Sequence, residues 1–312
     1  MGGALALAER GRGRTWPNPN VGCVIVADGH VVGRGWTQPG GRPHAEAMAL
    51  AEAGAAARGA TLYTSLEPCA HISARGPACS DAIIEAGLAR VVAARGDPDQ
   101  RTNGAGLARL RAAGIDVMTD VCAPAAARSM AGFLTRRRYG RPHVTLKLAL
   151  SLDGAAAMAD GRSQWITGAA ARAHGHVARA RADAILVGRG TWETDKPTLD
   201  VRLPGLEERS PAIVLLSSGA SAANIVASPA GIGKLEADWL LVEGGMATAA
   251  SFLRADLVDS LFLYRAPVFI GGGRTLGDIG LADLADAHGR WSHADSRRLG
   301  SDTLDVYERI RG

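Results

Sequence analysis

The chain of 312 residues has few aromatic residues, few cysteines and no long apolar run. Phe, Trp and Tyr make up 4% of the sequence, which argues against the aromatic-lined groove of single-stranded nucleic-acid binders. No stretch approaches the ~18 consecutive apolar residues of a membrane span. Four cysteines favour metal binding or catalysis over a disulfide scaffold. What is present, 47% hydrophobic and 21% charged residues, is typical of a globular protein with sizeable cores.

The charge of the chain is nearly balanced, with 35 Lys and Arg against 31 Asp and Glu. A net charge of +4 suits a small anionic substrate and is too slight to indicate nucleic acid as a partner. Two arginine runs, at residues 10–14 and 136–141, are interpreted as solvated helix ends. Residues 1–14 lack an apolar core followed by a cleavage site, so we expect a cytoplasmic protein without a signal peptide.

Strand-like and helix-like segments alternate along the chain, which predicts an α/β fold. A hairpin around Asp28-Gly29 precedes strand–helix repeats, which indicates a mixed sheet with helices on its faces. Residues 124–138 are expected to form one helix. The break at residues 139–142 places the boundary between units of residues 1–141 and 142–312. The second unit starts a new α/β pattern, with residues 304–310 expected as a closing edge strand.

The most specific pattern is a set of metal-ligand residues in the first unit, His44, Cys69 and Cys79. One imidazole and two thiolates give Zn²⁺ three protein ligands and leave the fourth position for water, whose pKa zinc lowers toward ~7. Glu46, two residues after His44, is placed to move a proton from the attacking water to a departing amine. This is the arrangement of zinc deaminases that act on cytosine-type or adenine-type rings.

The spacing of the two cysteines leaves other interpretations open. Residues 70–78 separate Cys69 from Cys79, whereas such deaminases commonly have two residues there. A closed structural zinc site would need a fourth ligand, for which His71 is the nearby candidate. A zinc-stabilised binding module without turnover is one alternative function. A deaminase acting on adenosine in transfer RNA is the other.

Four motifs follow one another in the first unit: residues 15–22 (TWPNPNVG), residues 44–46 (HAE), residues 66–69 (LEPC) and the long spacing between the cysteines. Together they resemble the bifunctional deaminase/reductase family of riboflavin biosynthesis. The resemblance implies a cytidine-deaminase-like domain that deaminates 2,5-diamino-6-ribosylamino-4(3H)-pyrimidinone 5′-phosphate. It also implies that Asn18 reads the pyrimidine ring and that Arg75 meets the substrate phosphate, while Gly76 replaces a threonine of the family.

The second unit by itself carries only general nucleotide-binding signals. The strand-like residues 239–242 lead through Glu243 and Gly244-Gly245 into a helix, a junction that can point backbone N–H groups at an anion. Residues 271–274 form a second glycine-rich loop. Neither segment matches the Rossmann fingerprint, so the sequence does not predict a standard dinucleotide-binding fold.

Longer motifs at residues 147–154 (KLALSLDG), 163–167 (SQWIT), 179–185 and 190–202 resemble the reductase domain of the same family. That domain is similar to dihydrofolate reductase and uses NADPH. The resemblance implies reduction of the ribosyl group to ribityl, with Asp195 or Glu243 handling a proton. It places NADPH against Ala149, Trp165, Thr191, Asp195, Ser217, Gly244 and Gly245. It places the ribose phosphate substrate against Ser163, Arg179, Leu199, Arg202 and Glu243.

The second unit departs from the family pattern at Lys196 and Asp200, which replace an acid and a threonine. In addition, only residues 219–242 separate Ser218 from Glu243, fewer than the family has there. We therefore expect a shortened reductase domain, with a deaminase-only enzyme as the alternative. The expected cofactors are Zn²⁺ and NADPH. The expected partners are a small pyrimidine ribose phosphate and further copies of the chain, with no nucleic acid and no membrane.

Overall fold

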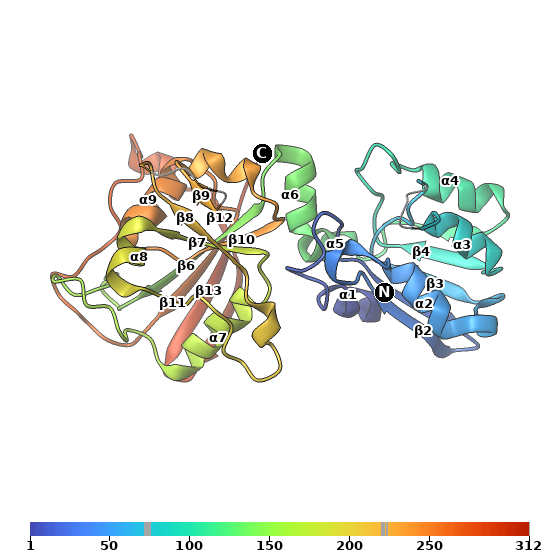
Figure 1. Cartoon of the computed structure of the whole chain (residues 1–312), viewed down its shortest axis with the longest axis horizontal. Helices are drawn as coiled ribbons and strands as arrows, with labels where there is room; N and C mark the ends of the chain where they lie inside the picture. The colour runs from blue at the N-terminus through green and yellow to red at the C-terminus, as the bar shows by residue number, and fades with distance from the viewer. Residues whose placement is uncertain (72–75, 220–221, 223, 312) are drawn as a thin grey trace. The chain divides into compact units, whose positions relative to one another are not determined.

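The computed structural model describes residues 1–71, 76–219, 222 and 224–311. It divides into two compact units, Met1–Gly140 and Arg141–Gly312, each with its own sheet and apolar core (Figure 1). Both units combine helices and strands, so the predicted α/β class is confirmed. Within the described part of the chain, we find no helix with the length and apolar character that a membrane crossing requires.

A five-stranded mixed sheet with the order β2-β1-β3-β4-β5 forms the centre of the first unit. β1 and β2 make the expected antiparallel hairpin through Asp28 and Gly29, which both have positive φ. β3, β4 and β5 run parallel, and the helices between them make the crossovers. The strands are β1 (Gly22–Ala27), β2 (His30–Trp36), β3 (Thr61–Thr64), β4 (Arg90–Ala93) and β5 (Asp116–Met118).

Close packing between β2 and α2 fixes the start of that helix. A Cβ on Gly35 would lie 2.0 Å from the carbonyl oxygen of Ala45, so only glycine lets the helix backbone approach the strand this closely. His44 and Glu46 stand at this end of α2. The helices of the unit are α1 (Gly2–Ala8), α2 (Ala45–Ala53), α3 (Cys79–Glu85), α4 (Ala105–Ala112), α5 (Ala123–Ser129) and α6 (Ala131–Tyr139), with 3₁₀ turns η1 (Pro39–Gly41) and η2 (Gly54–Ala57).

The expected single helix over residues 124–138 is wrong. Met130, with φ of −111°, separates α5 from α6. The Met130 side chain is completely buried in the core of the unit, and Phe133 is buried beside it in the same cluster. No proline lies at the break, and Gly132 follows two residues later inside α6, so the burial of Met130 is the feature that coincides with the break itself.

The second unit contains an eight-stranded sheet with the order β12-β13-β11-β6-β10-β7-β8-β9. The strands from β11 to β9 in this order all run parallel, so their carboxyl ends meet at one edge. Figure 1 shows β6, β7 and β10 in the middle of the unit. The strands are β6 (His143–Leu150), β7 (Ala184–Gly188), β8 (Ala212–Leu216), β9 (Ile225–Val226), β10 (Trp239–Val242), β11 (Ser260–Arg265), β12 (Trp291–Leu299) and β13 (Asp302–Arg309).

The expectation that residues 304–310 close the sheet as an edge strand is wrong. β13 lies between β11 and β12, and β12 is the edge strand. β12 exposes most of its side chains and carries several charges, a pattern that protects a sheet edge and hides the strand from a search for apolar alternation. The helices of the unit are α7 (Ala169–Arg179), α8 (Arg189–Asp195) and α9 (Met246–Arg254), with 3₁₀ turns η3 (Glu207–Arg209), η4 (Pro229–Lys234) and η5 (Leu284–Ala287).

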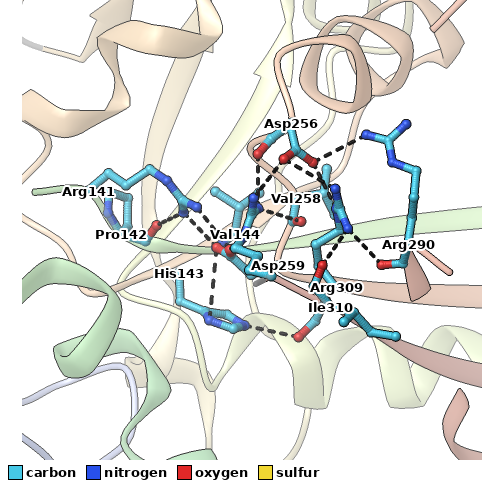
Figure 2. Close-up of polar contacts among 12 residues, drawn as sticks. Arg141, Pro142, His143, Val144, Asp256, Val258, Asp259, Arg290, Arg309 and Ile310 are labelled. Carbon is cyan, nitrogen blue, oxygen red and sulfur yellow. Dashed lines mark hydrogen bonds and ion pairs between the residues drawn. The ribbon is translucent and has the colours of Figure 1, made fainter. Parts of the chain in front are cut away.

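Arg141 is buried, which corrects the interpretation of its run as a solvated helix end. Its Nη1 and Nη2 donate to Asp259 Oδ2 and Oδ1 at 2.6 and 2.9 Å. Figure 2 shows Asp256 and Asp259 surrounded by Arg141, Arg290 and Arg309. Burial raises the pKa of Asp259, but the Arg141 hydrogen bond and neighbouring positive charge outweigh it and hold that pKa below its usual value. The cluster fastens the beginning of β6 to the C-terminal part of the chain.

Candidate active sites

Three separate segments bring the predicted metal ligands of the first unit together. His44 directly precedes α2, Cys69 lies in the loop after β3, and Cys79 is the first residue of α3. Their ligand atoms all lie within 4.8 Å of one another, with His44 Nδ1 3.3 Å from Cys79 Sγ and 3.6 Å from Cys69 Sγ. One imidazole and two buried sulfurs in this arrangement fit a tetrahedral zinc ion with one position left for a non-protein ligand.

The electrostatics of the cluster favour a thiolate at Cys69. Hydrogen bonding from the Cys79 thiol, and then from His44 and the Cys79 backbone N–H, lowers the pKa of Cys69 to about 4. The thiolate is the form that binds metal. His71 lines the adjoining cavity, but among the described residues the metal-binding group consists of His44, Cys69 and Cys79. No described residue therefore closes the site as a fourth ligand.

Glu46 is almost completely buried in the first turn of α2, next to the metal ligands. Thr64 Oγ1 donates a hydrogen bond to Glu46 Oε1 at 3.0 Å and so fixes the carboxyl group. Burial is the main cause that raises the pKa of Glu46 above its usual value. A carboxyl group with a raised pKa at this position can both accept and return a proton.

A small cavity of 40 Å³ adjoins the metal ligands. Asn18 lines it and donates from Nδ2 to the Gly41 carbonyl oxygen at 2.6 Å, which fixes the amide and leaves Oδ1 as an acceptor. Arg75 lies outside the described residues. The cavity also contains residues that the sequence did not single out as site residues, namely Asp97, Asp99, Arg101, Phe133 and Arg137.

Two of these additional residues, Asp97 and Asp99, are acids whose pKa values are shifted in opposite directions. Burial raises the pKa of Asp97 to about 6. The pKa of Asp99 is lowered, first by its hydrogen bond from Arg101. Arg137 reaches the same carboxylate from α6, with Nη2 2.7 Å from Asp99 Oδ2. The closely spaced acids Asp97 and Asp99 in the loop after β4 are a sequence signal that could have found them, whereas Arg137 is hidden in a run of arginines on a helix.

The second unit has a cavity of 1310 Å³ at the carboxyl edge of its parallel strands. Ligand sites in open α/β sheets occur at such an edge, and this volume is enough for a dinucleotide together with a small substrate. Every residue that the sequence assigned to this site lines the cavity. These are Ala149, Ser163, Trp165, Arg179, Thr191, Asp195, Leu199, Arg202, Ser217, Glu243, Gly244 and Gly245.

An ion network occupies one part of this cavity. Arg179 Nε and Nη2 donate to Glu243 Oε1 and Oε2 at 2.8 and 2.9 Å, and Lys147 Nζ lies 3.6 Å from Glu243 Oε2. Burial raises the pKa of Glu243, but the charges of Lys147 and Arg179 outweigh it and bring that pKa to about 2. Lys147 lies in the motif at residues 147–154, but the sequence assigns it no role because only the fold brings it against Glu243.

The junction after β10 is shaped for close approach of a ligand. A Cβ on Gly244 would lie 2.7 Å from the Thr248 Cβ, so this position requires glycine. The Gly245 N–H donates to Thr191 Oγ1 at 3.1 Å, which joins this turn to α8. The shortened segment between Ser218 and Glu243 still contains β9 and β10. Ala227 and Ser228, which follow β9, line the cavity. The cavity wall and the glycine turn fit a bound dinucleotide.

Comparisons with known proteins match both units of the chain. The family model described as "Cytidine and deoxycytidylate deaminase zinc-binding region" matches residues 1–95. The family model described as "RibD C-terminal domain" matches residues 142–230 and 230–304. The chain is 39% identical to the riboflavin biosynthesis protein RibD of Escherichia coli K12, over 97% of this chain and 96% of that protein. It is also 39% identical to RibD of Mycobacterium tuberculosis H37Rv, over 97% and 95%.

Solved structures of the same kind match nearly the full length of the chain. Acinetobacter baumannii RibD, form 1, matches with a TM-score of 0.87 and 33% identity over 99% of this chain and 97% of that one. A deaminase/reductase from Thermotoga maritima matches with a TM-score of 0.87 and 31% identity over 98% and 97%. The chain belongs to the RibD family of riboflavin biosynthesis proteins, bifunctional enzymes in which a zinc-dependent deaminase domain is combined with an NADPH-dependent reductase domain.

Proposed function

We propose that the first unit deaminates 2,5-diamino-6-ribosylamino-4(3H)-pyrimidinone 5′-phosphate and that the second unit reduces the ribosyl group of the product to ribityl. The Thermotoga maritima relative is described as a diaminohydroxyphosphoribosylaminopyrimidine deaminase and 5-amino-6-(5-phosphoribosylamino)uracil reductase. The observation that carries the proposal is the cluster of half-buried His44 with buried Cys69 and Cys79 beside Glu46, in a chain that also has the Arg179–Glu243–Lys147 cavity.

In the deaminase site, His44, Cys69 and Cys79 would hold the zinc ion. Bound zinc supplies a Lewis acid that makes water nucleophilic near neutral pH. Glu46 takes a proton from the attacking water and delivers it to the departing amine, which leaves as ammonia. Asn18 holds the pyrimidine ring through its free amide oxygen, and Asp97 offers a carboxyl group to the ring substituents.

In the reductase site, bound NADPH supplies the hydride. The ribosyl ring opens to an imine-like form, and C1′ accepts the hydride to give the ribityl chain. Arg202 would bind the substrate phosphate. Glu243 remains ionised because its pKa is about 2, and Lys147, whose Nζ lies 3.6 Å from Glu243 Oε2, would donate the required proton. Asp195 is the second candidate for handling a proton at this site.

A two-stage assay on zinc-loaded protein tests the proposal. The diaminopyrimidine phosphate is supplied and ammonia is measured first, after which NADPH is added and its absorbance is followed. We expect ammonia release followed by NADPH consumption. Ammonia without NADPH consumption would mean a deaminase with a degenerate second unit. Absence of ammonia would contradict the substrate assignment, and transfer RNA would be the next substrate to test.

We also propose that the protein acts in the cytoplasm and self-associates. The proposed substrate and NADPH are both soluble small molecules, which supports the location. Sedimentation in the analytical ultracentrifuge measures the association directly, and a single species at the mass of one chain would contradict it.

A further inference from the structure

Lys147 of β6 has two close neighbours that attract a positive charge. One is the Glu243 carboxylate, whose Oε2 lies 3.6 Å from Lys147 Nζ. The other is the aromatic ring of Tyr264 in β11, whose centroid lies 5.7 Å from the same Nζ. A cation within about 6 Å of the centre of an aromatic face is attracted by the negative face of the ring. The ring is not part of the ion network, so its contact with Lys147 needs an explanation of its own.

Sheet pairing brings the ring to this place. β6 and β11 are neighbouring parallel strands, and Lys147 pairs with Phe262. Two residues further on, Ala149 pairs with Tyr264. Residues two apart on a strand point to the same face of a sheet, so Lys147 and Ala149 share a face, and the small Ala149 leaves space for the larger ring beside it. Lys147 and Tyr264 both line the smaller cavity of 270 Å³ that also contains Glu243.

The Tyr264 side chain is held in one orientation. It is among the largest completely buried side chains of the chain. Its hydroxyl oxygen lies 2.7 Å from His174 Nδ1 on α7, which is a short hydrogen bond. The same helix carries Arg179, so this bond joins β11 to the helix that provides the second cation of the network. A buried ring with a bonded hydroxyl group has little freedom to turn, so it offers Lys147 a fixed surface.

The carboxylate alone holds Lys147 only loosely. Arg179 already donates to both carboxylate oxygens of Glu243, at 2.8 and 2.9 Å. Lys147 Nζ, at 3.6 Å, lies beyond hydrogen-bond distance from the same group. A lysine amine is a point charge on a flexible four-carbon chain, so it needs a further contact to keep one position. The Tyr264 ring supplies that contact.

The Tyr264 hydroxyl group is itself a poor proton donor. Burial, and then the negative charge of Glu243, raise the pKa of Tyr264 above its usual value. A phenol with a raised pKa keeps its proton, and this one is also bonded to His174. The face of the ring, rather than the hydroxyl group, is therefore the part of Tyr264 that acts on Lys147.

We propose that Tyr264 is a positioning residue for the reduction, whose ring, anchored by His174, holds the charged amine of Lys147 where it can deliver its proton. The inference rests on the proposed reduction and on Lys147 as its proton donor. In that step the C1′=N bond of the opened substrate takes the hydride at carbon and the Lys147 proton at nitrogen, which leaves a single C–N bond and a neutral amine on Lys147. Tyr264 acts through Lys147 and transfers no proton.

Reversing the charge distribution of the ring at constant size tests the proposal. Tyr264→Phe keeps the aromatic face and removes only the hydroxyl group. Pentafluorophenylalanine at position 264 keeps the size of that ring but makes its face positive. The matched control is pentafluorophenylalanine in place of Phe252, which is completely buried in the core of the same unit and does not line the cavity. Circular dichroism and a thermal melt establish that each variant of the full chain is folded.

We expect Tyr264→Phe to keep kcat for the NADPH-dependent reduction within about threefold of the wild type. Pentafluorophenylalanine at position 264 should lower kcat about 3- to 30-fold further, which is the range of a single cation–π contact. The KM for the substrate should change less than about twofold, because the ring acts on the proton donor and not on substrate binding. The variant at position 252 should match the wild type. Equal kcat for the two variants at position 264, or a raised KM with unchanged kcat, would overturn the proposal.

A second measurement needs neither substrate nor NADPH. The sequence contains three lysines, Lys147, Lys196 and Lys234, so reductive methylation with ¹³C-formaldehyde gives few NMR signals. Lys196 and Lys234 are exposed, so the ring current of Tyr264 should move only the Lys147 signal upfield. Lys147→Arg assigns that signal by removing it, and Tyr264→Leu should return it to the position of the other two.

The two measurements separate failure of the ring contact from failure of the proposed reduction. An unchanged Lys147 signal in Tyr264→Leu would overturn the ring contact, whatever the activity of the enzyme. A shifted Lys147 signal in wild-type protein that consumes no NADPH would overturn the positioning role together with the proposed reduction.

Discussion

Arg179 binds both carboxylate oxygens of Glu243, through Nε at 2.8 Å and Nη2 at 2.9 Å, inside the cavity of the second unit. The two residues come from α7 and from the turn after β10, so the pair links two segments distant in sequence. Lys147 of β6 approaches the same carboxylate. A strand (β6), a helix (α7) and the turn after β10 thus converge on one ionised acid. This convergence gives the site both a fixed geometry and a marked dependence on pH.

The Glu243 network should make the second unit sensitive to acid. The pKa of Glu243 is about 2 in the folded chain against an ordinary value of 4.5, so the stabilisation is present above pH 4.5 and is lost as the pH falls toward 2. A shift of this size corresponds to about 3 kcal/mol of unfolding free energy. We expect wild-type protein to lose about that amount between pH 5 and pH 2 beyond what Glu243→Gln loses.

Urea unfolding followed by tryptophan fluorescence measures this difference, since the buried Trp239 of β10 reports on the second unit. Glu208→Gln, at an exposed position in η3, is the matched control and should follow the wild type at every pH. Parallel curves for wild type and Glu243→Gln would show that the carboxylate is not held in its charged form by the network.

Glu46→Gln should stop deamination while leaving the rest of the protein intact. The amide can keep the hydrogen bond from Thr64 but can no longer carry a proton, so ammonia release should fall about 10²- to 10⁴-fold. Zinc content and NADPH affinity should remain as in the wild type. Glu52→Gln changes an exposed acid of the same helix, paired with Arg34, and should have normal activity. Ammonia release above a tenth of the wild-type rate in Glu46→Gln would remove Glu46 from the proton path.

Zinc removal should separate the two activities. A chelator, or the substitution Cys69→Ser, takes away the metal or one of its ligands, so ammonia release and zinc content should fall together. Reduction of the deaminated substrate by NADPH should continue, since the reductase residues all lie in the other unit. Cys122→Ser, at an exposed cysteine, is the control and should keep its zinc. Full ammonia release from metal-free protein would exclude the zinc mechanism.

The metal site could be predicted because its residue types and order already carry the chemistry. His44 and Cys79 stand at the beginnings of helices, Cys69 lies in the loop after β3, and the structure brings their ligand atoms within 4.8 Å. Lys147 and Arg137 could not be assigned in the same way. Each gains its place in a site only when an element from elsewhere in the unit packs against it, Lys147 beside Glu243 and Arg137 beside Asp99.

The errors in the predicted elements have a similar physical origin. β12 consists mostly of exposed polar residues and packs few apolar side chains, so periodicity in apolar residues cannot find it. The break at Met130 arises where the side chain is buried in the core, and no proline marks it. In both places tertiary packing decides what local propensity leaves open.

The burial of Arg141 is also decided by tertiary packing. Its substitution tests how much the cluster of Figure 2 contributes to the stability of the second unit. Arg141→Met leaves Asp259 buried with Arg311 as its remaining arginine partner, so the second unit should lose about 2–3 kcal/mol of unfolding free energy. Arg138→Met, at an exposed position in α6, should cost less than about 0.5 kcal/mol. The double variant Arg141→Met with Asp259→Asn should be more stable than the sum of the two single losses predicts, because each single change leaves a buried partner unpaired. Strict additivity in urea unfolding would mean that Arg141 and Asp259 do not stabilise the fold as a pair.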